Sequence, residues 1–451
     1  MEFSTEMLGK MAELVAEEMI RVTEPGAALM TVEDGLREAL RQVGSRALGS
    51  YISRREGNPV GAVTCGCGER APRLAKRDAK VISVFGKISY QREYYLCRAC
   101  GQGQCPLDQR LGIEPGQVTP GLAKLLALAG VEVAFEEAGR WMEQFLLFRV
   151  SDNTIRKETE RFGELQAQRE ADWQEHSQDE KELQQRLQRT GRRAGRLYAS
   201  IDGAMAPLQG EWRELKSIAW YQVEPLKAYQ TRRHHGTRVG EQSHLQAQAI
   251  SYHCQFREAE QFGSFAWATG WKREADLYEQ LVFVCDGAQW IWKLVERYFP
   301  GAVQIVDWYH ASQYLTPIAE TAWGLSSPAG QAWLENARSS LWDGRIADLI
   351  QDCQEVGQAQ PQAQEAVHKT VTYFANNQKR MDYARFRADG YLIGSGIIES
   401  GCKQIVALRL KRAGARWTEA GAVKTAKARA AWLSGDWNIL AAERAALPLA
   451  G

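Results

Sequence analysis

The chain has 451 residues, enough for two to four domains, and its composition of 45% hydrophobic and 25% charged residues is that of a globular protein. No apolar run approaches the ~18 residues that a membrane span needs, and the acidic, amphipathic N-terminus is unlike a signal peptide, so we expect a cytoplasmic protein without membrane contact. A formal net charge of +1 excludes a chain that is basic throughout, so any anionic partner would have to meet local patches.

Residues 1–60 predict two helices. Thr31-Val-Glu-Asp34 is typical of an N-cap followed by acids in the first helical turn. We interpret this segment as a helical lead-in.

A small module at residues 61–112 carries paired cysteines. The segment between the pairs, residues 81–90, alternates in polarity and contains a glycine, which predicts a β-hairpin. Two cysteine knuckles around a hairpin are the layout of a zinc ribbon with four thiolate ligands. The four candidate zinc ligands are Cys65, Cys67, Cys97 and Cys100.

Three alternatives at this module stay open. Cys65-x-Cys67 is one residue shorter than a usual knuckle, so Cys105 could replace one ligand. The thiols could also be free and buried in a small β unit. A redox Cys-x-x-Cys is less favoured, because no helix obviously begins between Cys97 and Cys100.

Residues 113–163 predict three short helices. Thr119-Pro120 begins the first, residues 134–142 form the second, and Val150–Ile155 caps the third. The pattern fits a helix-turn-helix-like unit or an ordinary three-helix packing module, and several basic residues favour the first. Residues 164–195, rich in Gln, Glu and Arg, predict a solvated linker helix.

The order of elements in residues 196–310 predicts an α/β domain. Three strand-like runs come first, then a strand, a helix at residues 288–296 and a last strand. This is the order of the RNase H fold. The predicted strands are residues 198–201, 214–221, 246–254, 281–285 and 303–307.

The remainder of the chain reads as helical. Residues 311–390 predict an all-helical insertion, and residues 391–451 complete the predicted domain. We expect a long helix to start at Gly394 and to carry Glu399. The two glycines of Gly394-Ser-Gly396 permit the backbone to approach a ligand closely.

Two buried strands end in an acid followed by glycine, at Asp202 and at Asp286. A carboxylate beside an apolar strand is costly to bury unless a cation or hydrogen bonds compensate it. We therefore expect Asp202 and Asp286 to share two Mg²⁺ ions with Glu399, in the manner of two-metal phosphodiester chemistry. Asp-Gly after a strand is also a common turn signal, and that reading stays open for each aspartate.

Asp307-Trp-Tyr-His310 follows the last predicted strand. Asp307 and His310 fall on one face if the strand turns into a helix. They could act beside the metal ions or orient DNA. The alternative is a helix cap and a buried, satisfied histidine.

A basic stretch follows Glu399. Such a run is usually a solvated helix face, but its position directly after a candidate catalytic acid favours contacts with DNA phosphates. The candidate DNA-binding residues are Lys403, Arg409, Lys411, Arg412, Arg416 and Lys424.

These motifs, taken in order, resemble those of the DDE transposases of bacterial insertion sequences. The similarity is greatest to the ISKra-type family, is more distant to the Mutator-like group, and covers roughly residues 60–435. The motifs are Ser-Ile-Asp202-Gly, Asp286-Gly-Ala-x-Trp-Ile-Trp292, Asp307-x-x-His310, Gly-Ser-Gly-x-x-Glu399-Ser-x-x-Lys403, Arg-Leu-Lys-Arg412 and, in the front module, Cys-Pro-Leu-Asp108 with Leu-Gly112.

The resemblance implies an RNase H-like catalytic core with a helical insertion and a zinc-binding N-terminal region. It implies a magnesium-dependent triad of Asp202, Asp286 and Glu399, with Asp307 and His310 as the motif ahead of the insertion. It also implies binding to terminal inverted repeats and target DNA, action as a homodimer or higher oligomer, and association with the nucleoid. The chain departs from the family at Cys65-x-Cys67 and at Ala415, where methionine is expected.

Three other functions compete with this one. A nuclease or resolvase of the same fold would cut DNA without joining strands. A domesticated protein would bind DNA without catalysis. A hydrolase of small phosphates fits poorly, because it leaves the basic stretch and the front module without a purpose.

Overall fold

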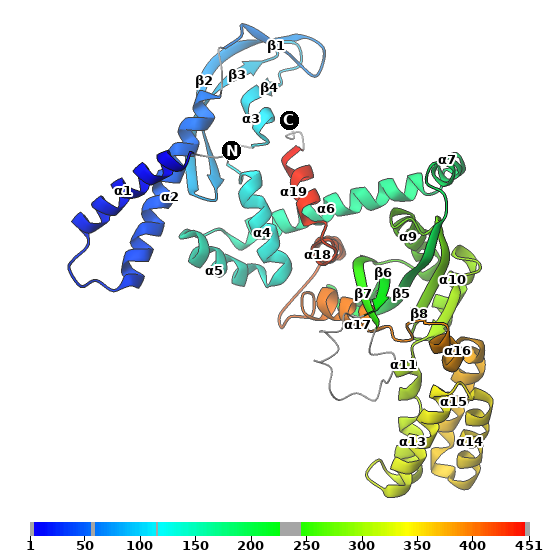
Figure 1. The fold of residues 1–451 in the computed structure, drawn as a ribbon. Coiled ribbons are helices and arrows are strands. Elements are labelled where there is room, and N and C mark those ends of the chain that lie inside the picture. The colour runs from blue at the N-terminus through cyan, green and yellow to red at the C-terminus, as the bar shows by residue number, and fades with distance from the viewer. Residues whose placement is uncertain (1–3, 56–58, 114–115, 226–244, 447–451) are drawn as a thin grey trace. The chain divides into compact units, whose positions relative to one another are not determined.

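The computed structural model describes residues 4–55, 59–113, 116–225 and 245–446 (Figure 1). Contacts divide the chain into two compact units. The first consists of residues 1–158 and 441–451, and the second of residues 159–440. Within the described ranges, no helix combines the length and the apolar character that a membrane span requires.

The first unit contains a four-stranded antiparallel sheet, in the order β1-β2-β3-β4, and helices before and after it. The two helices expected in residues 1–60 are present. The elements are α1 (Thr5–Val22), α2 (Leu29–Arg54), β1 (Ala62–Thr64), β2 (Arg70–Ser83), β3 (Gly86–Leu96), β4 (Gly103–Gln104), α3 (Pro106–Leu111), α4 (Pro120–Glu132), α5 (Phe135–Leu146) and the start of α6 (Asp152–His176).

The predicted hairpin is present as β2 and β3, which are longer than residues 81–90 on both sides. Gly86, with φ of 89°, supplies the left-handed conformation that the tight turn needs. Val81 and Ile88 pair across the strands and bury their side chains against Ile52 of α2. The hairpin thus has one apolar face, and α2 covers it.

The three helices expected in residues 113–163 form a small apolar core. Thr119 caps α4 with its side chain, and Pro120 occupies the first helical turn, where its missing N–H costs nothing. Leu122 and Leu126 of α4 are fully buried against Ile155 of α6. The packing suits either alternative for this segment, and its role in DNA binding stays a prediction.

The second unit is built on a five-stranded mixed sheet in the order β7-β6-β5-β8-β9. Strands β5, β6 and β7 pair antiparallel, whereas β8 and β9 run parallel to β5. All five predicted strands are present. The elements are α7 (Glu180–Thr190), β5 (Arg193–Pro207), β6 (Trp212–Pro225), β7 (Leu245–Gln255), α9 (Ala259–Lys272), β8 (Tyr278–Cys285), α10 (Gln289–Tyr298) and β9 (Val303–Val306).

Aromatic side chains form the core on the face of this sheet that α9 and α10 cover. The indole of Trp220 on β6 lies 5.8 Å from the ring of Phe283 on β8 and 5.7 Å from that of Phe299. Its Nε1–H donates to Thr269 of α9 at 3.0 Å, so the buried polar atom is satisfied. Burial of this kind explains why β5, β6 and β8 read as apolar runs.

The expected helical insertion is present and forms a bundle (Figure 1). Its elements are α11 (Trp308–Gln313), α12 (Thr316–Trp323), α13 (Pro328–Trp342), α14 (Ile346–Ala359), η2 (Pro361–Ala363), α15 (Gln364–Asn377), η3 (Gln378–Arg380) and α16 (Tyr383–Ala388). Pro328 and the Ser327 cap mark one helix start as sequence rules expect.

The prediction of a long helix from Gly394 is wrong. Helix α17 (Gly396–Cys402) has seven residues and passes into a π-helical turn, η4 (Lys403–Ala407). Gly414, with φ of 76°, then turns the chain before Thr418 caps α18 (Glu419–Leu433). A last helix, α19 (Trp437–Ala446), follows. Glycine at a left-handed position and a fresh N-cap both break a helix, so the basic stretch is divided among three elements.

The linker predicted as a solvated helix is partly buried. Glu170 of α6 accepts a hydrogen bond from His253 of β7 at 3.0 Å and pairs with Lys427 of α18. All three side chains are buried. Although burial by itself raises the pKa of Glu170, the charges of Lys427 and His253 outweigh it and lower that pKa to about 2. This buried ion pair fastens α6 and α18 to the edge strand β7.

Replacing Lys427 with methionine should reduce the free energy of unfolding by about 3 kcal/mol, because it leaves a buried carboxylate without its cation. Urea denaturation of the full chain measures this. Lys424→Met is the matched control on the same helix. Lys424 pairs with Glu164 at 2.5 Å with both side chains partly exposed, so its loss should cost less than about 1 kcal/mol. Equal losses in the two variants would contradict the assignment.

Candidate functional site

Three neighbouring strands of the five-stranded sheet position aspartates: Asp202 lies within β5, and Asp286 and Asp307 directly follow β8 and β9. In the β5–β8 pairing Ala199 lies opposite Phe283, an offset of 84 residues, and the same offset relates Asp202 to Asp286. In the β8–β9 pairing Cys285 lies opposite Val306, and the same offset of 21 relates Asp286 to Asp307. Since β5, β8 and β9 are parallel, the three acids lie on the same side of the sheet, towards the carboxyl ends of the strands. Ligand-binding sites of α/β sheets usually lie there.

Asp202 lies within β5, so the turn interpretation of its Asp-Gly pair is wrong. Its carboxylate accepts from the backbone N–H of Gly203 at 2.7 Å and from the thiol of Cys402. Burial and, secondarily, the charge of Asp286 raise the pKa of Asp202. The space above Gly203 is occupied by the side chain of Glu214 on β6, whose carboxylate would have to move if residue 203 carried a β-carbon.

Asp286, by contrast, lies in a turn. Gly287 has φ of 93°, and the Asp286 carboxylate accepts from the N–H of Ala288 at 3.0 Å. The turn leads directly into α10. The side chain of Asp286 is half-buried at the mouth of the site.

Glu399 approaches the aspartates from α17, which packs against β5 and β6. Cys402, one turn later on the same helical face, bonds to Asp202. Partial burial, followed by the charges of Asp307 and Asp202, raises the pKa of Glu399. On the far side of α17, Gly401 allows the ring of Tyr252 to pack closely, because a β-carbon would lie 2.5 Å from it.

Asp307 holds the segment that leads to Glu399. One carboxylate oxygen accepts from the N–H of His310 at 2.7 Å and caps α11, and the other accepts from the N–H of Ser395. The N–H of Trp308 adds a bond to the carbonyl of Ile393 at 3.0 Å. Because Asp307 is 1% exposed and both oxygens are bonded to the backbone, the structure gives it a positioning role.

His310 is half-buried, and its backbone N–H is the group that Asp307 caps at the start of α11. The helix cap of the alternative interpretation is therefore present, and a role for His310 beside the acids stays a prediction. Its ring also meets that of Tyr314 edge-on at 6.0 Å.

The acids fit divalent ions by their chemistry, since all three offer hard carboxylate oxygens. The carboxylate oxygens of the three acids do not all lie close together. Among the described residues, only a cysteine cluster has three or more ligand atoms within 4.8 Å of one another.

The candidate DNA-binding residues divide into two groups. Lys403, Lys411 and Arg416 are exposed, Arg412 is half-buried, and Lys424 pairs with Glu164. Arg409 is buried: its side chain is 2% exposed, and its guanidinium lies 5.0 Å from the ring centre of Trp417. Its role in DNA binding stays a prediction.

The four predicted zinc ligands gather in the first unit, and their sulfur atoms all lie within 4.8 Å of one another. The Cys65–Cys100 and Cys67–Cys97 distances between Sγ atoms are 3.5 and 3.7 Å. Four sulfurs at ~2.3 Å around a tetrahedral zinc would lie ~3.8 Å apart. The cluster can thus hold a metal ion such as zinc despite the short first knuckle.

Cys105 is not in this cluster; it precedes α3 at the N-cap position, where its side chain makes no capping hydrogen bond. Backbone N–H groups of Cys100 and Ala99 lower the pKa of the Cys97 thiol to about 7, which favours the thiolate that a metal binds.

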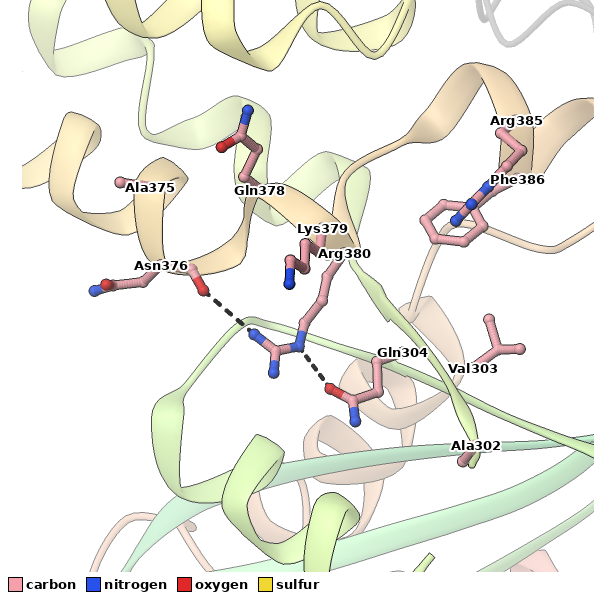
Figure 2. Close-up of a pocket in the computed structure, with 10 residues that line it drawn as sticks. All are labelled: Ala302, Val303, Gln304, Ala375, Asn376, Gln378, Lys379, Arg380, Arg385 and Phe386. Atoms are coloured by element: carbon pink, nitrogen blue, oxygen red, sulfur yellow. Dashed lines mark hydrogen bonds between the residues drawn. The ribbon is translucent and has the colours of Figure 1, made fainter. Parts of the chain in front are cut away.

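Among the cavities of the second unit, one borders α11 and another borders β9. One, of about 920 Å³, is lined by Trp308 and Tyr309 of α11 and by Arg338 and Trp342 of α13. Its α11 wall directly follows Asp307. The other, of about 500 Å³, lies at the start of β9, the strand end remote from Asp307, and is shown in Figure 2.

In the smaller cavity, the positive charge of Arg380 is partly offset by a neighbouring carboxylate. Figure 2 shows Lys379 and Arg380 projecting from η3 towards the start of β9. Arg380 is already bonded to Gln304 at 2.6 Å and to Glu296 at 2.8 Å. This cavity is therefore not part of the acidic site.

Sequence reasoning missed the residues that support the acids. Cys402, Ser395 and Tyr373 all contact them or their backbone. Cys402 could have been found from its spacing of three after Glu399. Tyr373 lies in the helical insertion and carries no sequence signal.

The profile of the Uncharacterised protein family (UPF0236) matches residues 69–439, and the chain belongs to that family. The match begins one residue before β2 and includes all three acids. A comparison with curated proteins found no match.

Replacing Cys97 or Cys100 with serine should reduce bound zinc from one ion per chain to less than about 0.1, because three thiolates bind zinc far more weakly. Elemental analysis of the purified full chain measures this. Cys105→Ser is the matched control and should keep its zinc. Loss of zinc in the control, or its retention without Cys97, would contradict the assignment.

Proposed function

We propose that the chain is a DDE-type DNA transposase that cleaves transposon ends and joins the 3′-hydroxyl to target DNA. The observation that carries the proposal is the convergence of Asp202 and Asp286, on neighbouring parallel strands, with Glu399 on α17. The sequence motifs around these acids resemble those of insertion-sequence transposases.

The sheet supports an RNase H-like core. Three antiparallel strands followed by two parallel strands, in the order β7-β6-β5-β8-β9, match the order expected of that fold. The first strand of the fold, β5, is central and carries Asp202. A helical bundle separates β9 from Glu399, as the resemblance implies.

The residues of the proposed magnesium centre would have separate roles. Asp202 would bridge two Mg²⁺ ions, Asp286 would hold one, and Glu399 would complete the shell of the other. Magnesium bound there would supply the positive charge that activates the attacking oxygen and stabilises the leaving oxygen. Asp307 would keep the Glu399 segment in place through Ser395.

His310 would stabilise negative charge near Asp202 and Glu399. Its position in α11, three residues after the Asp307 cap, supports this role.

Charged and aromatic groups around the centre suit a nucleic acid. Lys403 and Lys411 are exposed on the segment after Glu399, within reach of phosphates. The cavity lined by Trp308, Tyr309 and Trp342 offers aromatic side chains on which a base could stack, and its carboxylates, Glu335 and Asp343, disfavour a small phosphate. This supports DNA over a small-molecule substrate.

The same proposal extends to zinc, DNA partners and assembly. The cysteine module would bind structural zinc, the protein would bind terminal inverted repeats as a homodimer or higher oligomer, and it would act at the nucleoid.

Asp202→Asn should lower strand cleavage and joining at least about 100-fold, more than the loss of a residue that only supports a metal ligand costs. A labelled duplex of the DNA flanking the gene, with supercoiled plasmid and Mg²⁺, allows both products to be measured on gels. Asp389→Asn, on an exposed carboxylate at the end of α16, is the matched control and should retain activity.

The products separate the competing functions. Joined products that require Asp202 support the proposal. Cleaved ends without joined products would indicate a nuclease or resolvase, and unchanged activity in Asp202→Asn would exclude this centre.

A further inference from the structure

Tyr373 of α15 reaches from the helical insertion to the turn that carries Asp286. Its hydroxyl donates a hydrogen bond to the backbone carbonyl of Asp286 at 2.6 Å. Asn377, one helical turn later and 3% exposed, donates to the carbonyl of Gly287 at 3.5 Å. Two side chains on one face of α15 thus hold two successive carbonyls of the turn.

The fit between the phenol and the turn depends on glycine. A β-carbon at residue 287 would lie 2.5 Å from the Tyr373 hydroxyl oxygen. Gly287 therefore serves twice: it adopts a φ of 93°, and it leaves room for Tyr373 to contact the backbone directly.

The ring of Tyr373 is itself held in place. It stacks on Tyr314 with ring centres 3.9 Å apart and planes 9° from parallel. Tyr314 follows α11, the helix that Asp307 caps and that carries His310. The hydroxyl is therefore aimed at Asp286 by a fixed aromatic pair rather than by a mobile side chain.

We propose that Tyr373, assisted by Asn377, is a positioning residue that sets the Asp286 carboxylate for metal binding. The centre is then complete only when α15 of the insertion is docked on the turn. This inference rests on the proposed function, because it assigns Asp286 a metal ion. Tyr373 acts through the backbone of Asp286, as partners of metal ligands commonly do.

Mn²⁺ is the probe, and its binding to the full chain with zinc in place is followed by electron paramagnetic resonance, without DNA. Tyr373→Phe should bind Mn²⁺ about 10-fold more weakly, the lower end of what loss of a ligand's partner costs. In the metal-free protein, amide hydrogen exchange at residues 286–289 should become faster, because the turn has lost its tether. This second measurement does not depend on metal or activity.

Tyr278→Phe is the matched control. It removes a phenol that accepts from Gln222 at 2.6 Å elsewhere in the same unit, and it should change neither measurement. Asn377→Ala supplies a second variant and should increase exchange in the same segment.

The outcomes are distinguishable. Parental Mn²⁺ affinity and exchange in Tyr373→Phe, or equal changes in Tyr278→Phe, would overturn the positioning role alone, provided that Asp202→Asn lowers Mn²⁺ affinity. If Asp202→Asn binds Mn²⁺ like the parent chain, the metal centre is wrong, and the proposed function fails together with this inference.

Discussion

The parallel pairing of β5, β8 and β9 is the constraint on which the second unit depends. A strand register fixes which residues lie opposite one another, and a slip by one residue would send every side chain to the other face. Asp202, Asp286 and Asp307 come together because the two register offsets align them. The apolar residues before each acid bury the strands and hold that register. The acids are thus placed by the packing of their neighbours.

At these strand ends, hydrogen bonds to the backbone support the acids more than ion pairs do. Asp307 fastens Ser395, Tyr373 fastens the Asp286 turn, and the N–H of Gly203 bonds to Asp202. Such bonds keep carboxylates fixed without neutralising them. A cluster of this kind retains the negative charge that a divalent ion would meet, and the raised pKa values of Asp202 and Glu399 reflect that unrelieved repulsion and burial.

Much of the fold was predictable because its signals are local. Apolar runs predicted the five strands, and the Thr119-Pro120 signal predicted the start of α4. The cysteine cluster that could hold a metal ion was predictable from two cysteine pairs around a hairpin, although the first pair is closely spaced. The long helix after Gly394 could not be excluded, because helix propensity along the basic stretch concealed the left-handed Gly414. The burial of Arg409 and the contact of Tyr373 depend on tertiary packing, which no residue pattern in the sequence encodes.

Both outer strands of the five-stranded sheet are partly covered. On β7, the N–H of Tyr252 donates to the hydroxyl of Ser434 at 2.8 Å, and α18 packs against the strand. On the opposite side, β9 has only four residues, and Arg380 bonds to the side chain of Gln304 at 2.6 Å. Unpaired strand edges are templates for aggregation, and short or covered edge strands reduce that risk. The cover on β7 and the shortness of β9 therefore make edge-to-edge pairing of two sheets less favourable.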